Sequence, residues 1–118
     1  MNKRIVIWAC LLICLVTTCS VHPVEQAKRQ ISIGMSREEA IRILSTQAWY
    51  HQECRNLSSI DDLFFFGSHD YERADVVIVT SVLEGQSYRV YEVGTFLETN
   101  VWHTAYQDCI QRDKFEDQ

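Results

Sequence analysis

Residues Ala74–Phe96, ADVVIVTSVLEGQSYRVYEVGTF, decide the fold class of this chain. Val76–Thr80 are five β-branched residues in succession, which favour an extended strand. Glu84-Gly85-Gln86 then interrupts the apolar pattern as a hairpin turn would, and a second strand follows from Tyr88. The stretch therefore predicts two antiparallel strands, and the aromatic run Leu63–Phe66 predicts another strand before them.

A helix is predicted on each side of these strands along the chain. Ser36 is a good N-cap and Glu39 completes a capping box, so a helix should run over residues 37–47. A second helix should begin near Val101, after Thr99 or Asn100 as its cap, and carry an apolar stripe.

These elements predict an α+β fold: a small antiparallel three- to four-stranded sheet with an N-terminal helix and a C-terminal helix packed on one face. Residues 48–55, between the first helix and the aromatic strand, fit a strand or a second short helix, and we favour the strand. No internal repeat is visible in the sequence.

Composition limits the classes of protein to which the chain can belong. With 118 residues it is long enough for one domain, and 47% hydrophobic residues argue against wholesale disorder. The formal net charge is −5. Without Lys3 and Arg4, which lie in a segment that we expect to be removed, 9 basic residues face 16 acidic ones. A nucleic acid is therefore not expected as a partner.

The first eighteen residues are expected to be a secretory signal peptide. A basic start precedes Ile5–Val16, an unbroken apolar run of 12 residues. A membrane-spanning helix needs about 20 apolar residues, so this run is too short for one. We therefore divide the chain into a signal peptide at 1–18, a lipid anchor and flexible tether at 19–30, and a single α+β domain at 31–118.

The end of this segment, Leu15–Ser20, reads LVTTCS and resembles a bacterial lipoprotein signal, in which the cysteine is lipidated and becomes N-terminal. The resemblance implies that Cys19 carries acyl chains such as palmitate and that the membrane is a partner. Thr18 departs from the Gly, Ala or Ser usual before the cysteine, and ordinary cleavage after Ser20 stays open as the alternative. Ser20 is similar to the residue that accompanies delivery to the Gram-negative outer membrane.

Two cysteines, Cys54 and Cys109, remain once the exported chain has been processed. An even pair in an oxidising compartment favours a disulfide, and this one would close a 55-residue loop. Such a loop would stabilise the fold by roughly 4 kcal/mol on the chain-entropy model. The alternatives are two free buried thiols, or Cys54 as a nucleophile with His51 as its base.

Gly34–Ala40, GMSREEA, resembles the helix start of small outer-membrane lipoproteins of the SmpA/OmlA type, which include the E subunit of the β-barrel assembly machinery. The resemblance covers Cys19–Phe96 in outline and implies a lipid anchor, a tether, an N-terminal helix, a three-stranded meander and a place in an envelope protein assembly. The same helix start also resembles secreted domains built like the β-lactamase inhibitor. The cysteine pair and the aromatic C-terminal helix depart from the family pattern, so no partner-binding residue is carried over.

Residues that could support catalysis or bind a metal are present but poorly spaced. His51 with Glu53, and His69 with Asp70, lack the i, i+4 helical spacing of a zinc enzyme. Ser68, His69 and Asp70 are neighbours in a loop and cannot converge as a triad does. We therefore expect no catalytic residue, no metal and no cofactor, and we expect that the chain is not an enzyme.

Aromatic side chains supply the candidates for partner binding. Phe64, Phe65 and Phe66 place rings on both faces of one strand, so helices on one face alone would leave some rings to a partner. Filling of the core is the competing interpretation. The partner-binding candidates are Phe64, Phe66, Trp102 and Tyr106.

Together these features lead us to expect a non-enzymatic lipoprotein on the periplasmic side of the outer membrane, acting as a structural or protein-interaction module. A secreted or soluble periplasmic inhibitor or ligand-binding domain, of β-lactamase-inhibitor-like fold, is the alternative.

Overall fold

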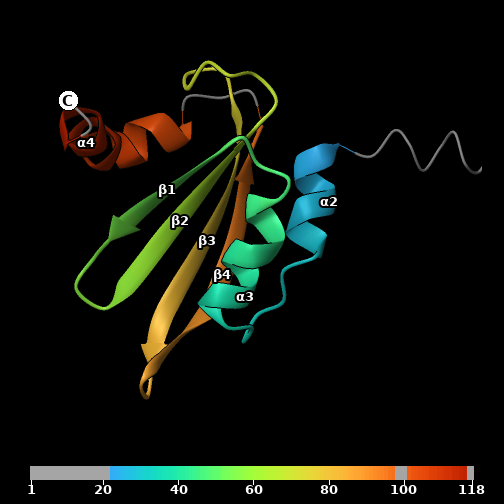
Figure 1. Ribbon diagram of the computed structural model, residues 1–118, viewed down its shortest axis with the longest axis vertical. Helices are drawn as coiled ribbons and strands as arrows, with labels where there is room; N and C mark the ends of the chain where they lie inside the picture. Colours follow the sequence, from blue (N-terminus) through green and yellow to red (C-terminus); the bar gives the residue numbers. More distant parts are fainter. Residues whose placement is uncertain (1–21, 98–100, 117–118) are drawn as a thin grey trace, which may run out of the picture.

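The computed structural model describes residues 22–97 and 101–116 of the chain. Three helices and four strands follow one another in the order shown in Figure 1: α2 (Pro23–Arg29), α3 (Arg37–Ser45), β1 (Tyr50–Arg55), β2 (Ser59–Phe66), β3 (Asp75–Glu84), β4 (Ser87–Phe96) and α4 (Val101–Glu116). The predicted α+β class is confirmed, and so is the strand interpretation of residues 50–55.

The sheet is a simple meander in which each strand pairs antiparallel with the next, in the order β1-β2-β3-β4. Gly85 and Gln86 connect β3 to β4, and Gly85 has a φ of +68°, a conformation that side chains with a Cβ rarely adopt. Opposite Thr80 and Ser81 the register shifts, and Tyr91 is the extra residue on β4.

Strand β2 starts earlier than predicted. The aromatic run predicts a strand only from Leu63, whereas β2 begins at Ser59. Asp61 and Asp62 consequently lie within the sheet and are buried. They are accommodated because side chains from other elements pair with both carboxylates.

Helices cover both faces of the sheet. One hydrophobic cluster joins Phe64, Phe66, Val77 and Val79 to buried side chains of α2 and α3, while a second joins Leu63, Phe65, Val76 and Ile78 to Trp102 and Ile110 of α4. The structure thus differs from the expected packing on one face alone. The reason is the alternation of the strand: the ring of Phe65 points away from α3 and contacts Trp102, with ring centroids 4.9 Å apart.

Helix α2 occupies the segment that was predicted to be a flexible tether, so that prediction is wrong for residues 23–29. Val24 and Ala27 are fully buried in the same cluster as α3, and Ile31 continues their stripe. These positions have the i, i+3, i+7 spacing of one helix face, which is hard to see in a helix of seven residues. The folded domain therefore begins by His22 and not at residue 31.

Helix α3 begins where the sequence predicts. The Ser36 hydroxyl oxygen accepts a hydrogen bond from the Glu39 backbone N–H at 3.2 Å, which confirms the N-cap. Just before the helix, the Gly34 N–H donates to the Val90 carbonyl at 2.8 Å, and the Val90 N–H donates to Met35 at 2.8 Å. The N-terminal end of α3 is thereby held on the outer edge of β4.

Helix α4 follows β4 and is kinked at Tyr106, whose φ and ψ are −116° and 16°. Thr99 and Asn100, the predicted caps, lie outside the described residues. Across residues 22–97 and 101–116, no helix is both long and apolar enough to cross a membrane.

Candidate functional site around the edge strand β1

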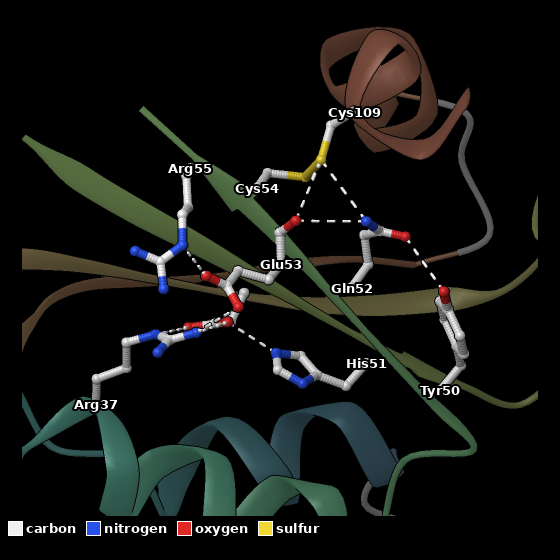
Figure 2. Close-up of a disulfide and its surroundings, with 9 residues drawn as sticks. Arg37, Tyr50, His51, Gln52, Glu53, Cys54, Arg55 and Cys109 are labelled. Carbon is white, nitrogen blue, oxygen red and sulfur yellow. Dashed lines mark hydrogen bonds and ion pairs between the residues drawn. A yellow bond between two sulfur atoms is a disulfide. The ribbon is translucent and has the colours of Figure 1, made fainter. Parts of the chain in front are cut away.

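Three of the residues that the sequence suggested for chemistry, His51, Glu53 and Cys54, lie on β1, at the edge of the sheet. Figure 2 shows His51, Glu53 and Arg55 on the side of α3, and Tyr50, Gln52 and Cys54 on the side of α4. This separation follows from the two-residue period of a strand. The strand therefore presents an ionic network on one face and a disulfide on the other.

The ionic network is centred on Asp62, whose side chain is only 1% exposed. Arg37, the first residue of α3, donates to both carboxylate oxygens of Asp62, at 2.8 Å from Nε and 2.9 Å from Nη2. The His51 Nε2 donates to Asp62 Oδ1 at 2.7 Å. A bidentate guanidinium and an imidazole thus hold one buried carboxylate between α3 and β1.

The network continues outward along β1. Glu53 lies 3.3 Å from Nη2 of Arg37, and Arg55 forms an ion pair with the other oxygen of Glu53. The His51 ring stacks on Phe64 with centroids 4.5 Å apart. Negative and positive side chains therefore alternate from the buried carboxylate outward, in the order Asp62, Arg37, Glu53, Arg55.

The pKa of Asp62 lies below its ordinary value. Burial of the carboxyl acts to raise this pKa, but the hydrogen bonds from His51 and Arg37, together with the charge of Arg37, outweigh the burial. Asp62 is therefore ionised at neutral pH. Because its oxygens already accept from both neighbours, it is a poor general base, and the network acts chemically as a clamp between α3 and the sheet.

The neighbouring residue, Asp61, performs a matching role on the opposite face. The Thr80 hydroxyl donates to Asp61 Oδ1 at 2.6 Å, and the Tyr106 hydroxyl of α4 also donates to this carboxylate. Burial and the charge of Asp61 raise the pKa of Tyr106 to about 12, so its hydroxyl stays protonated as a donor. Two consecutive aspartates thus attach helices on opposite sides of one strand.

The predicted disulfide between Cys54 and Cys109 is present and joins β1 to the second half of α4. Gln52, which is 1% exposed, donates from Nε2 to the Cys109 sulfur at 3.8 Å. Beside the bridge lies an open cavity of about 360 Å³, whose lining includes Arg55, Asp61 and Tyr106. Cys54 is therefore not available as a nucleophile while the bridge is intact.

The structure corrects most of the partner-binding candidates. Phe64 and Trp102 are fully buried and Phe66 is 5% exposed, so these three rings fill the two hydrophobic clusters. Tyr106 is half-buried, and its hydroxyl is hydrogen-bonded to Asp61. The competing interpretation, that these aromatic residues fill the core, is the correct one for Phe64, Phe66 and Trp102.

The large apolar side chains that are exposed come from elsewhere. Leu57 lies in the β1–β2 turn, Leu83 near the end of β3 and Ile33 before α3. Tyr91 lies at the β4 bulge, and Leu97 directly follows β4. The sequence did not single out Leu57, Leu83 or Ile33, because an isolated apolar residue has no pattern to mark it as exposed. Scattered exposure of this kind is normal and does not by itself define a docking surface.

The histidine pairs considered as metal ligands are engaged in other contacts. His51 bonds Asp62, and the His69 ring stacks on Trp49 with centroids 4.9 Å apart. Within residues 22–97 and 101–116, no group of three or more His, Cys, Asp or Glu side chains is arranged to hold a metal ion.

The ionic network could not have been found from local sequence, because Arg37 and Asp62 are 25 residues apart.

Cys19, the predicted lipidation site, lies outside the described residues. No protein-family model, curated protein or solved structure matches this chain.

Proposed function

We propose that this chain is an exported, lipid-anchored protein of the bacterial envelope that acts as a structural or protein-interaction module and not as an enzyme. The observation that carries the proposal is the Cys54–Cys109 bridge between two elements of the fold. Disulfides of this structural kind persist in oxidising compartments such as the periplasm. The bridge thus agrees with the export expected from the apolar run Ile5–Val16 and with lipidation at Cys19.

The site chemistry supports a binding role over a catalytic one. The buried carboxylates of Asp61 and Asp62 are both used to attach helices, and Cys54 is oxidised. A nucleophile needs a free thiolate, which Cys54 lacks while the bridge is intact. A general base needs an available lone pair, and Asp62 already accepts from both Arg37 and His51. The resemblance of Gly34–Ala40 to the SmpA/OmlA lipoproteins adds the outer membrane and an envelope assembly to the proposal.

Metabolic labelling with an alkyne analogue of palmitate tests the anchor directly. In a Gram-negative host, the unaltered protein should incorporate the label and sediment with membranes. Cys14→Ala is the matched control, because Cys14 lies in the same apolar run but before the expected cleavage site, and it should label equally well. Cys19→Ala should abolish labelling. An unlabelled mature chain that starts at Val21 would overturn the proposal.

The alternative, a secreted inhibitor or ligand-binding domain, is favoured by one observation: the polar cavity beside the disulfide. The carboxylates in its lining, Asp61 and Asp108, would suit a small polar ligand better than an apolar one. Recovery of unlipidated protein from the periplasm or the medium, with a small molecule that copurifies and is lost in Asp108→Ala, would favour this alternative.

A further inference from the structure

The start of helix α2 is fastened to one end of the sheet. His22, its N-cap, lies with Nε2 3.3 Å from a carboxylate oxygen of Asp75, the first residue of β3. In the first turn, Glu25 accepts from the Thr95 hydroxyl at 3.3 Å, near the end of β4. In Figure 1 this end of α2 lies at the same end of the sheet as the β2–β3 loop.

Docking of α2 in the core makes this attachment rigid. Val24 and Ala27 are fully buried, so α2 cannot swing away from the sheet without exposing part of the first hydrophobic cluster. Its N-terminal end therefore moves with the sheet as one body.

Very little chain separates this attachment from the proposed anchor. Only Ser20, Val21 and His22 lie between Cys19 and Pro23, the first residue of α2. Even fully extended, the chain from Cys19 to Pro23 reaches at most about 14 Å. A flexible tether of the predicted length would have reached roughly 20 Å on average and allowed the domain to turn freely.

We infer that the acylated chain holds one particular end of its sheet, the β2–β3 loop of residues 67–74, against the lipid headgroups. This inference rests on the proposed lipid anchor at Cys19. The opposite end, with the β3–β4 turn at Gly85, stands up to about 30 Å away, because β3 has ten residues that rise about 3.3 Å each. The membrane thus covers one end of the domain, and the far end is left for protein contacts.

The short link between Cys19 and α2, and not attraction between charges, holds the β2–β3 loop at the lipid surface. The β2–β3 loop carries Asp70 and Glu72 against one Arg73, and all three residues are exposed. An acidic loop would not be drawn to anionic lipids. Vesicles of zwitterionic phosphatidylcholine are therefore the appropriate surface for a test.

Amide hydrogen exchange on such vesicles tests the inference, with link length as the variable. The acylated protein is compared with an acylated variant that has a flexible Gly/Ser segment of about twelve residues inserted between Val21 and His22, enough to add roughly 19 Å of reach. The native link should slow exchange in residues 67–74 several-fold relative to the lengthened link. Exchange in residues 84–88, at the far turn, should be the same in both.

Intact mass is measured first for both proteins. Absence of acyl chains on the unaltered protein contradicts the proposed anchor, whereas acylation with equal exchange in residues 67–74 overturns only the inference made here. Slow exchange with both links would also overturn it, because the loop would then be binding lipid by itself. In the same experiment, exchange in residues 37–45 of α3 reports that the insertion has left the fold intact.

Discussion

At the scale of single residues, the pair Asp61-Asp62 organises the molecule. Consecutive residues of a strand point to opposite faces, so one aspartate meets Arg37 of α3 and the other meets Tyr106 of α4. Each carboxylate is buried and compensated by donors, because a buried charge without partners would be very costly. The two residues therefore tie both helical layers to the same strand.

The depressed pKa of Asp62 makes stability depend on pH in a predictable direction. The ionised carboxylate is favoured in the folded state, so its contribution is complete above the ordinary value near 3.8 and is lost as the pH falls through the lower folded pKa. Asp62→Asn should lower the free energy of unfolding by about 3 kcal/mol at pH 7, and it should flatten the loss between about pH 5 and pH 2. Urea unfolding across this range measures both effects.

Asp70→Asn is the matched control, because Asp70 lies in the exposed β2–β3 loop with its side chain 56% exposed. The free energy of unfolding of the Asp70→Asn variant should equal that of the unaltered protein at every pH. Parallel curves for Asp62→Asn and the unaltered protein would show that the network contributes no pH dependence.

At the scale of elements, helix α4 depends on a few attachments that the kink at Tyr106 divides in two. The first half is held by Trp102 in the second cluster, and the second half by Ile110 and the disulfide at Cys109. Kinked helices can release one half while the other stays docked. The bridge is therefore expected to matter most for residues after the kink.

Removing the bridge should show this division. Cys54→Ser with Cys109→Ser should lower the free energy of unfolding by roughly 2–4 kcal/mol. Amide exchange should accelerate most in residues 107–110 and less in residues 102–105. In residues 37–45 of α3, exchange through local opening should be unchanged, and only exchange through global unfolding should become faster. Equal acceleration in both halves of α4 would contradict a separate role for the bridge. Thiol labelling of the unfolded, unreduced protein checks that the bridge exists in the unaltered chain.

Elements with strong local signals could be predicted from the sequence, and elements defined by distant partners could not. The β-branched run Val76–Thr80 and the cap at Ser36 each act within a few residues, so the hairpin and α3 were found. The start of β2 was missed because aspartates such as Asp61 and Asp62 are typical of turns. Only their partners in α3 and α4, which are distant in the sequence, explain why they lie in a strand. The site itself was mostly missed for the same reason, apart from the cysteine pair.

At the scale of the whole molecule, docking of α2 decides where the domain begins and how it can sit at a membrane. Val24 and Ala27 are the only fully buried residues of this short helix, and they pack with Leu44 of α3 in the first cluster. A seven-residue helix has little stability by itself, so it persists because of this burial. The same contacts hold its start beside Asp75, which is the basis for placing one end of the sheet at the lipid surface.

Val24→Ala therefore tests whether α2 belongs to the folded domain. The substitution removes two buried methyl groups and leaves a cavity under α2, which should lower the free energy of unfolding by about 2 kcal/mol. Gln26→Ala is the matched control, because Gln26 lies on the exposed side of the same helix and should change this free energy by less than about 0.5 kcal/mol. Chemical unfolding of both variants gives the comparison. If Val24→Ala is as neutral as Gln26→Ala, then α2 is not part of the core, residues 19–30 are a tether after all, and the link to the membrane is long enough for the domain to turn freely.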